Sequence, residues 1–120
     1  MSKVMHMDKL ARQALLYDFY GELLTEHQRR IYEDAVFNDL SPSEIAAEQG
    51  ISRQGVHDLI RRCDRILEDY EAKLHLVAKF LAIRDMAREV GRLAGECLAT
   101  GDMALVEEIR RKSEQISGAL

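Results

Sequence analysis

The residue spacing between Ile45 and Leu59 constrains the fold of this chain more than any other feature of its sequence. Ile45 is followed directly by Ala46, and Gly50 stands four residues after that alanine. The apolar residues that complete the pattern are Ile51, Val56 and Leu59. A small residue lets two helices cross closely, and glycine accepts the positive φ that ends one helix and turns the chain. This spacing predicts two helices joined by a tight turn, a helix-turn-helix, within a segment from about Leu24 to Arg65.

Helix-start signals accompany this pattern at three places. Thr25 is followed three residues later by Gln28, which is the spacing of a capping box. The run Ser41-Pro42-Ser43-Glu44 combines a serine cap, a proline at the first helical position and a glutamate three residues after the cap. Ser52 is placed to cap the second helix of the motif. The agreement of these signals favours a helix-turn-helix over an ordinary helical hairpin whose spacing matches by chance.

Apolar periodicity extends the helical prediction to the rest of the chain. We expect an apolar helix before the motif, from about Asp8 to Leu23. From Arg53 to about Leu98 the sequence holds no proline and no loop-forming cluster. The turn-forming run Thr100-Gly101-Asp102 then precedes a last amphipathic helix that ends near Ser117. Whether the helix after Ser52 continues unbroken to Leu98 is left open by the sequence.

These elements predict an all-α fold. It comprises a helix-turn-helix, a preceding apolar helix and a long C-terminal helical hairpin. We expect residues 1–71 to hold the first helix and the motif. Residues 72–120 are expected to form a packing or dimerisation element, and the two parts together to make one compact unit.

A heptad-like pattern of apolar residues begins at Leu76, in alternating steps of four and three. Its members are Leu76, Phe80, Ile83, Ala87, Val90, Ala94 and Cys97. It is widened by Leu74, Val77, Leu81, Met86 and Leu93. One interpretation is packing within the chain, against the first and last helices. The other is a homodimer interface, which we favour because so long an apolar face is more than two short helices readily cover.

The composition argues against several classes of function. The chain of 120 residues has a formal net charge of −4 and a pI of about 5.6, which disfavours strong sequence-independent binding of nucleic acid. No Gly-rich phosphate loop or nucleophile motif indicates an enzyme, a cofactor or a small-molecule substrate. The four histidines and the two cysteines lack the spacing of metal ligands. Because no apolar run suits a signal peptide or a membrane span, we expect a cytoplasmic protein without membrane contact.

On DNA, the helix that follows Ser52 would be the recognition helix. Glutamine and arginine read base edges in the major groove, and a helix N-terminus attracts phosphate. The candidate DNA-binding residues on this helix and its cap are Ser52, Arg53, Gln54, His57, Asp58, Arg61, Arg62 and Arg65. On the preceding helix, Arg29 and Arg30 are candidates for contact with the phosphate backbone.

The charge of the motif is the argument against DNA. Between Leu24 and Arg65 there are six Arg and no Lys against eight Asp or Glu, a net charge of −2. Asp58 and Asp64 stand close to the arginines in the sequence and would repel phosphate. The same scaffold can serve as a protein-docking module, so both interpretations stay open.

Part of the chain resembles region 4 of sigma factors in its general frame. This part is the run LTEHQRRIYEDAVFNDLSPSEIAAEQGISRQGVHDLIRRCDRILEDYEAKL. The chain is more similar to the YlxM family of small bacterial helix-turn-helix proteins. That likeness covers nearly the whole chain, through LLYDFYGELLT, SPSEIAAEQGISRQGVHDLIRR and the helical tail. Its most specific piece is SRQGVHDLIRR, so the positions from Ser52 to Arg62 match the recognition-helix motif directly.

The resemblance implies a DNA-binding or regulatory protein, and it carries no catalytic residues over to this chain. Genes of the family typically lie beside the gene for the signal recognition particle GTPase. The resemblance therefore also implies a role in that protein-targeting pathway. In the alternative interpretation, the chain binds the GTPase, its receptor or the particle RNA and does not bind DNA.

Overall fold

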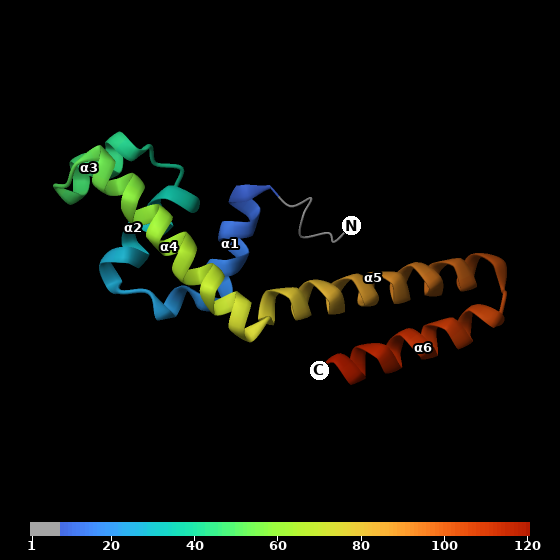
Figure 1. Cartoon of the computed structure of the whole chain (residues 1–120). Coiled ribbons are helices and arrows are strands. Elements are labelled where there is room, and N and C mark those ends of the chain that lie inside the picture. Colours follow the sequence, from blue (N-terminus) through green and yellow to red (C-terminus); the bar gives the residue numbers. More distant parts are fainter. Residues whose placement is uncertain (1–7) are drawn as a thin grey trace. The chain divides into compact units, whose positions relative to one another are not determined.

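The chain is a series of α-helices joined by short turns, in a computed structural model that describes residues 8–120 (Figure 1). These residues form six α-helices and one 3-10 helix, and no strand occurs among them. In chain order the elements are α1 (Lys9–Tyr20), the 3-10 helix η2 (Gly21–Leu23), α2 (Glu26–Val36), α3 (Pro42–Gln49), α4 (Arg53–Leu74), α5 (Leu76–Thr100) and α6 (Ala104–Ala119). The predicted all-α fold is confirmed, with α3 and α4 as the two helices of the helix-turn-helix.

The predicted helix starts are made by the predicted side chains. The hydroxyl of Thr25 accepts from the backbone N–H of Gln28 at 3.2 Å, and the Gln28 side chain accepts from the N–H of Thr25 at 2.9 Å. Ser41 and Glu44 form the same reciprocal pair at the start of α3, at 3.1 Å in both directions. Ser52 caps α4. Each cap satisfies a backbone donor that the helix itself leaves without a partner, which is typically worth about 1 kcal/mol.

The turn of the motif and its small core follow from the predicted spacing. Gly50 ends α3 with a φ of 67°, in the left-handed region. Ile31, Ile45 and Val56 are fully buried and bring α2, α3 and α4 together. Around them pack the partly buried residues Ala35, Leu40, Ala46, Ile51, Leu59 and Ile60. Burial of each large apolar side chain contributes about 1.5–3 kcal/mol, so this cluster fixes how α3 and α4 cross.

The helix that follows Ser52 does not continue to Leu98. It ends at Leu74, because His75 takes a left-handed conformation with a φ of 58°. The backbone N–H of His75 still donates to the carbonyl oxygen of Glu71 at 2.8 Å, which closes the last turn of α4. A new helix, α5, starts at the next residue.

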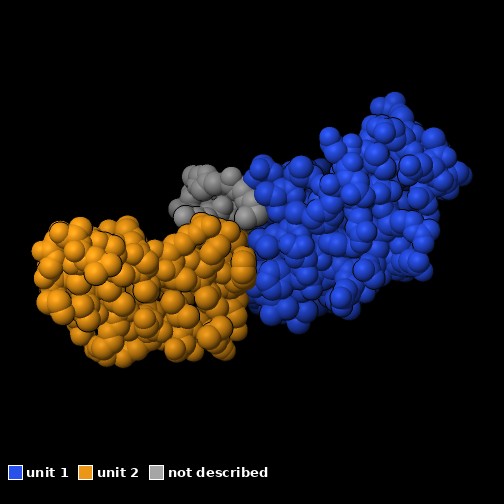
Figure 2. Space-filling view, turned by 180° about the vertical axis from the view of Figure 1, so that it is seen from behind, with its two compact units in different colours: residues 1–77 blue, residues 78–120 orange. Residues whose placement is uncertain are grey.

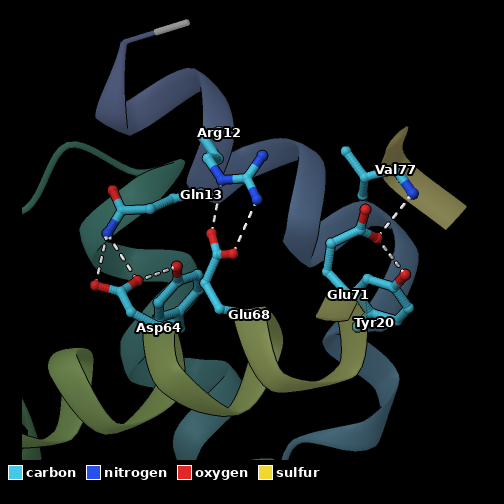
Figure 3. A network of polar contacts seen from close by, with 8 residues as sticks. Arg12, Gln13, Tyr20, Asp64, Glu68, Glu71 and Val77 are labelled. Atoms are coloured by element: carbon cyan, nitrogen blue, oxygen red, sulfur yellow. Dashed lines mark hydrogen bonds and ion pairs between the residues drawn. The ribbon is translucent and has the colours of Figure 1, made fainter. Parts of the chain in front are cut away.

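Two side chains take the place of an N-cap for α5. The backbone N–H of Val77 donates to Oε1 of Glu71 at 2.9 Å, and the N–H of Leu76 donates to the hydroxyl of Tyr20 at 3.2 Å. The Tyr20 hydroxyl in turn donates to the same Glu71 oxygen at 2.6 Å (Figure 3). Because the first N–H groups of a helix have no partner within it, these contacts stabilise the start of α5. They tie it to both α1 and the end of α4.

The chain divides into two compact units, the first ending at Val77 and the second comprising Ala78–Leu120 (Figure 2). The second unit consists of the remainder of α5, a turn at Gly101 with a φ of 72°, and α6. Within residues 78–120, all of which the structure describes, the buried side chains are Leu81 and Leu93. Both belong to the flanks of the heptad-like pattern, and none of the seven residues of the pattern itself is buried.

Candidate nucleic-acid interface

The recognition helix α4 has a polar side and an apolar side. Val56, Cys63 and Leu67 are fully buried along the apolar side. The polar side, which we call the α4 surface, is exposed throughout and consists of Ser52, Arg53, Gln54, His57, Asp58, Arg61, Arg62 and Arg65. The two sides follow from the helical repeat, which returns a residue to the same face every three or four positions. The structure thus brings together all the residues of α4 and its cap that the sequence singled out.

Asp58 lies between Gln54 and Arg61 on the α4 surface and bonds to both. The side-chain nitrogen of Gln54 donates to Asp58 Oδ1 at 3.0 Å, and Nη2 of Arg61 donates to the same oxygen at 2.7 Å. The bond from Gln54, and after it the bond and charge of Arg61, hold the pKa of Asp58 below its usual value. The side chains of Arg61 and Asp58 remain 65% and 59% exposed. In the free protein, an ionised carboxylate therefore engages the two side chains best suited to base edges.

A basic residue from outside the motif adjoins this surface. Lys9, in the first turn of α1, lines a shallow hollow together with Gln54, His57, Ile60, Arg61 and Asp64. It adds a positive charge beside the start of the recognition helix. Sequence reasoning missed Lys9 because the helix-turn-helix spacing contains no information about where the preceding helix lies.

Polar contacts between α1 and α4 hold Lys9 in this position. Arg12 forms a bidentate ion pair with Glu68, with N–O distances of 2.6 and 2.8 Å (Figure 3). Gln13 donates to the carboxylate of Asp64 at 3.0 Å, and the hydroxyl of Tyr32 donates to it at 2.5 Å. Asp64 is therefore half-buried and bonded to α1 and α2. The sequence placed it beside the arginines as a repulsive charge, but its carboxylate is occupied in holding three helices together.

Arg29 and Arg30 occupy a different part of the molecule. They line a depression made by α2 alone, together with Glu26 and Glu33. Arg30 pairs with Glu26 at 2.9 Å, and Arg29 donates a long 3.5 Å hydrogen bond to the hydroxyl of Tyr17, which donates to Glu33. Because two carboxylates balance the two arginines, this patch attracts phosphate less than the α4 surface does. Their contact with a DNA backbone stays a prediction.

The acidic residues of the motif are concentrated outside the recognition helix. Six of the eight precede Ser52, namely Glu26, Glu33, Asp34, Asp39, Glu44 and Glu48. From Ser52 to Arg65 there are four Arg against Asp58 and Asp64, a formal net charge of +2. The net charge of −2 over Leu24–Arg65 thus conceals a locally positive recognition helix.

Residues 8–120 include both cysteines and three of the four histidines. No group of three or more His, Cys, Asp or Glu among them could hold a metal ion, and His6 lies outside the described part. Cys63 and Cys97 are free, and burial raises the pKa of the Cys63 thiol to about 11, so that it is protonated at neutral pH. No helix between residues 8 and 120 has the length and apolar character needed to cross a membrane.

The sequence of residues 7–96 matches the UPF0122 family, described as helix-turn-helix protein, YlxM / p13 like. The chain belongs to this family. A UPF0122 protein of Shouchella clausii is 40% identical over 106 residues, which cover 88% of this chain and 97% of the relative. One of Acetivibrio thermocellus is 39% identical over 114 residues, with 92% and 97% covered. One of Symbiobacterium thermophilum is 48% identical over 73 residues, with 61% and 68% covered.

The family assignment confirms the resemblance to YlxM and the helix-turn-helix. In this UPF0122 protein the matched residues include α1 to α4 and most of α5, and hence Lys9, the α4 surface and the contacts between them. The helix α6 follows the matched region. The site and the elements that support it therefore lie entirely within the part that matches the family.

Proposed function

We propose that this UPF0122 protein is a DNA-binding regulatory protein that docks its α4 surface in the major groove of duplex DNA. The observation that carries the proposal is the separation of charge within the motif. Four arginines are exposed along one side of α4, and Asp58 is the one exposed carboxylate among residues 52–65, all of which the structure describes. A helix with this surface suits a groove between two phosphate backbones.

Each part of the α4 surface has a role in this proposal. The N-terminus of α4, with Arg53 beside it, faces a phosphate, because the first amides of a helix attract anions. Gln54 and Arg61 reach base edges, where glutamine suits adenine and arginine suits guanine. Lys9 contacts the backbone on one flank of the groove. Further along the helix, the backbone is contacted by Arg62 and Arg65.

Asp58 sets the selectivity of this surface. Arg61 exchanges its bond with Asp58 for a bond with a base, and the carboxylate stays within reach of phosphate. An arbitrary sequence offers no base contact that offsets this repulsion. Asp58 therefore weakens binding to random DNA more than binding to the preferred sequence.

Binding to genomic DNA fragments across a salt series tests the proposal. If four to five basic side chains neutralise phosphates, the logarithm of the association constant falls linearly with the logarithm of the salt concentration, with a slope of about −4. We expect saturable binding of some fragments below about 100 mM salt, with this slope. Absence of saturable binding even at the lowest salt would contradict the proposal.

The same purified protein tests the alternative function, which the net charge of −2 over Leu24–Arg65 favours. In that function the chain is a component of the signal recognition particle pathway. The probes are the purified targeting GTPase, its receptor and the particle RNA. Retention of one of them, together with no binding of any DNA fragment, would assign the protein to that pathway instead.

A further inference from the structure

The second unit has an apolar face on α5 that the other side chains of this unit do not cover. This face, here called the α5 face, consists of Ile83, Ala87, Gly91, Ala94 and Leu98, which the helical repeat places on one side. Ala87, Gly91 and Leu98 are exposed, Leu98 to 89%, and Ile83 and Ala94 are only half-buried. It overlaps the heptad-like pattern predicted from the sequence.

The helix α6 leaves this face open. None of the side chains of α6 is buried, and Val106 on α6 is 44% exposed. Leu93 of α5 is buried, but it lies outside the α5 face. Two helices with so few buried side chains do not make a self-sufficient core, because small units bury too little apolar surface to offset the entropy of ordering. A further layer of apolar side chains would supply what this hairpin lacks.

Gly91 gives a second reason to expect a close neighbour. It lies in the interior of α5, where glycine is about 1 kcal/mol less favourable than alanine. A Cβ atom built on Gly91 meets nothing within 4 Å, so no contact within the chain requires a glycine there. The open space would admit the backbone of another helix.

The charge of the second unit limits which kind of partner can bind to the α5 face. Ala78–Leu120 contains seven Lys or Arg and seven Asp or Glu, so the unit is formally neutral and the whole charge of −4 falls on the remainder of the chain. The charges of the unit are also paired with one another, as in Arg92 with Glu89 and Glu96. A neutral surface has no particular attraction for nucleic acid or for an anionic lipid surface. It does allow two copies of an acidic protein to meet without repulsion at the point of contact.

We infer that the α5 face is the interface of a homodimer, in which a second copy of the chain packs its own α5 face against the first. A two-fold dimer uses the same patch on both copies, and an apolar stripe with small residues is compatible with such pairing. The 25 residues of α5 extend over about 37 Å, which is long enough to contribute to an interface of about 800 Å² on each copy. This inference does not depend on whether α4 binds DNA.

Light scattering on the full chain tests the interface, with two variants in each of which an alanine of α5 is replaced by glutamate. Wild type at about 50 μM, well above the dissociation constants typical of stable dimers, is expected at twice the chain mass of 13.7 kDa. Ala87→Glu places a charge in the α5 face and is expected to give the mass of one chain. Ala82→Glu is the matched control, since Ala82 is also an exposed alanine of α5 and stands about 140° around the helix from Ala87. Each new glutamate has a basic residue three positions before it, Lys79 or Arg84, so local helix energetics are similar.

Leu98→Ser provides a second variant in case Ala87→Glu does not fold, because a side chain that is 89% exposed contributes little to the fold of a single chain. We expect it to weaken the dimer at least tenfold while the helical circular dichroism signal stays unchanged. A wild-type mass of one chain would overturn the inference. So would dimers that survive both α5-face variants, or an Ala82→Glu variant that dissociates as readily as Ala87→Glu.

Discussion

Arg61 donates a 2.7 Å hydrogen bond to Asp58, one turn earlier on the recognition helix, in the middle of the α4 surface. The same carboxylate oxygen accepts from Gln54. The negative charge therefore holds the two side chains that the proposal assigns to base edges, and it lies among the arginines assigned to phosphate. Loss of this charge should change DNA binding in a direction opposite to the loss of an arginine.

Asp58→Asn tests that expectation. The asparagine keeps the shape and removes the charge, so the bond to Arg61 is weakened and phosphate repulsion is lost. We expect affinity for random duplex DNA to rise roughly tenfold at about 50 mM salt, and the preference for the best genomic fragment to shrink. Fluorescence anisotropy with both duplexes measures the two effects.

Glu107→Gln is the control for Asp58→Asn. Glu107 pairs with Arg110 on α6 with the same spacing of three residues and is not part of the α4 surface. It should leave affinity and preference as they are in wild type. If Asp58→Asn binds random DNA no better than Glu107→Gln, the carboxylate does not oppose binding.

Tyr20→Phe should destabilise the first unit. The hydroxyl of Tyr20 donates to Glu71 and accepts from the N–H of Leu76, and both Tyr20 and Glu71 are buried. Removal of the hydroxyl deprives buried polar groups of a partner, at a cost of about 1–3 kcal/mol in the free energy of unfolding. Urea denaturation measures this cost. The control is Tyr70→Phe, a half-buried ring that stacks on Tyr20, and a loss as small as that of the control would argue against the role of Tyr20 at the start of α5.

Tyr32 should make the protein less stable in base. Burial, and after it the hydrogen bond to Asp64, raises the pKa of Tyr32 above its ordinary value of 10.0. Above pH 10 the unfolded chain therefore loses this proton while the folded chain keeps it. The contribution to stability is fully present below pH 10 and is lost as pH rises, by up to about 1.4 kcal/mol per pH unit. Tyr32→Phe should reduce this slope between about pH 10 and 11.5 in urea titrations, and equal slopes for the two proteins would contradict the assignment.

Two glycine substitutions should have opposite effects on stability. Gly50 has a φ of 67° at the turn of the motif, so Gly50→Ala should cost about 1–2 kcal/mol. Gly95 lies within α5, and a Cβ built there meets nothing within 4 Å, so Gly95→Ala should stabilise the helix by about 0.5–1 kcal/mol. Thermal denaturation compares the two variants. A neutral Gly50→Ala would mean that the turn relaxes to another conformation.

The helix boundaries of the motif were predictable because their causes are local. Thr25, Ser41 and Ser52 each accept from the amide three residues later, and Gly50 turns the chain through its own φ. The buried cluster of Ile31, Ile45 and Val56 follows from the same spacing. The identity and spacing of neighbouring residues in the sequence are therefore enough to predict these helix boundaries and the buried cluster.

The remaining features depend on residues that are distant in the sequence. The contacts of Arg12 with Glu68 and of Tyr20 with Glu71 join residues more than fifty positions apart, and no local pattern specifies them. They determine that Lys9 adjoins the α4 surface and that α5 starts at Leu76. The break at His75 has no glycine or proline to signal it. It occurs where Tyr20 and Glu71 supply partners for the amides of a new helix.

DNA binding by Arg61→Ala, measured on the preferred fragment and on random duplex DNA, tests the central claim most directly. Arg110→Ala is the matched control, because Arg110 is similarly exposed and pairs with an acidic residue three positions earlier. If α4 docks on DNA, Arg61→Ala weakens binding to the preferred fragment roughly tenfold and reduces the preference for that fragment over random duplex DNA, while Arg110→Ala behaves as wild type. Unchanged affinity and unchanged preference in Arg61→Ala, or the same loss in both variants, would contradict the assignment of the α4 surface to DNA.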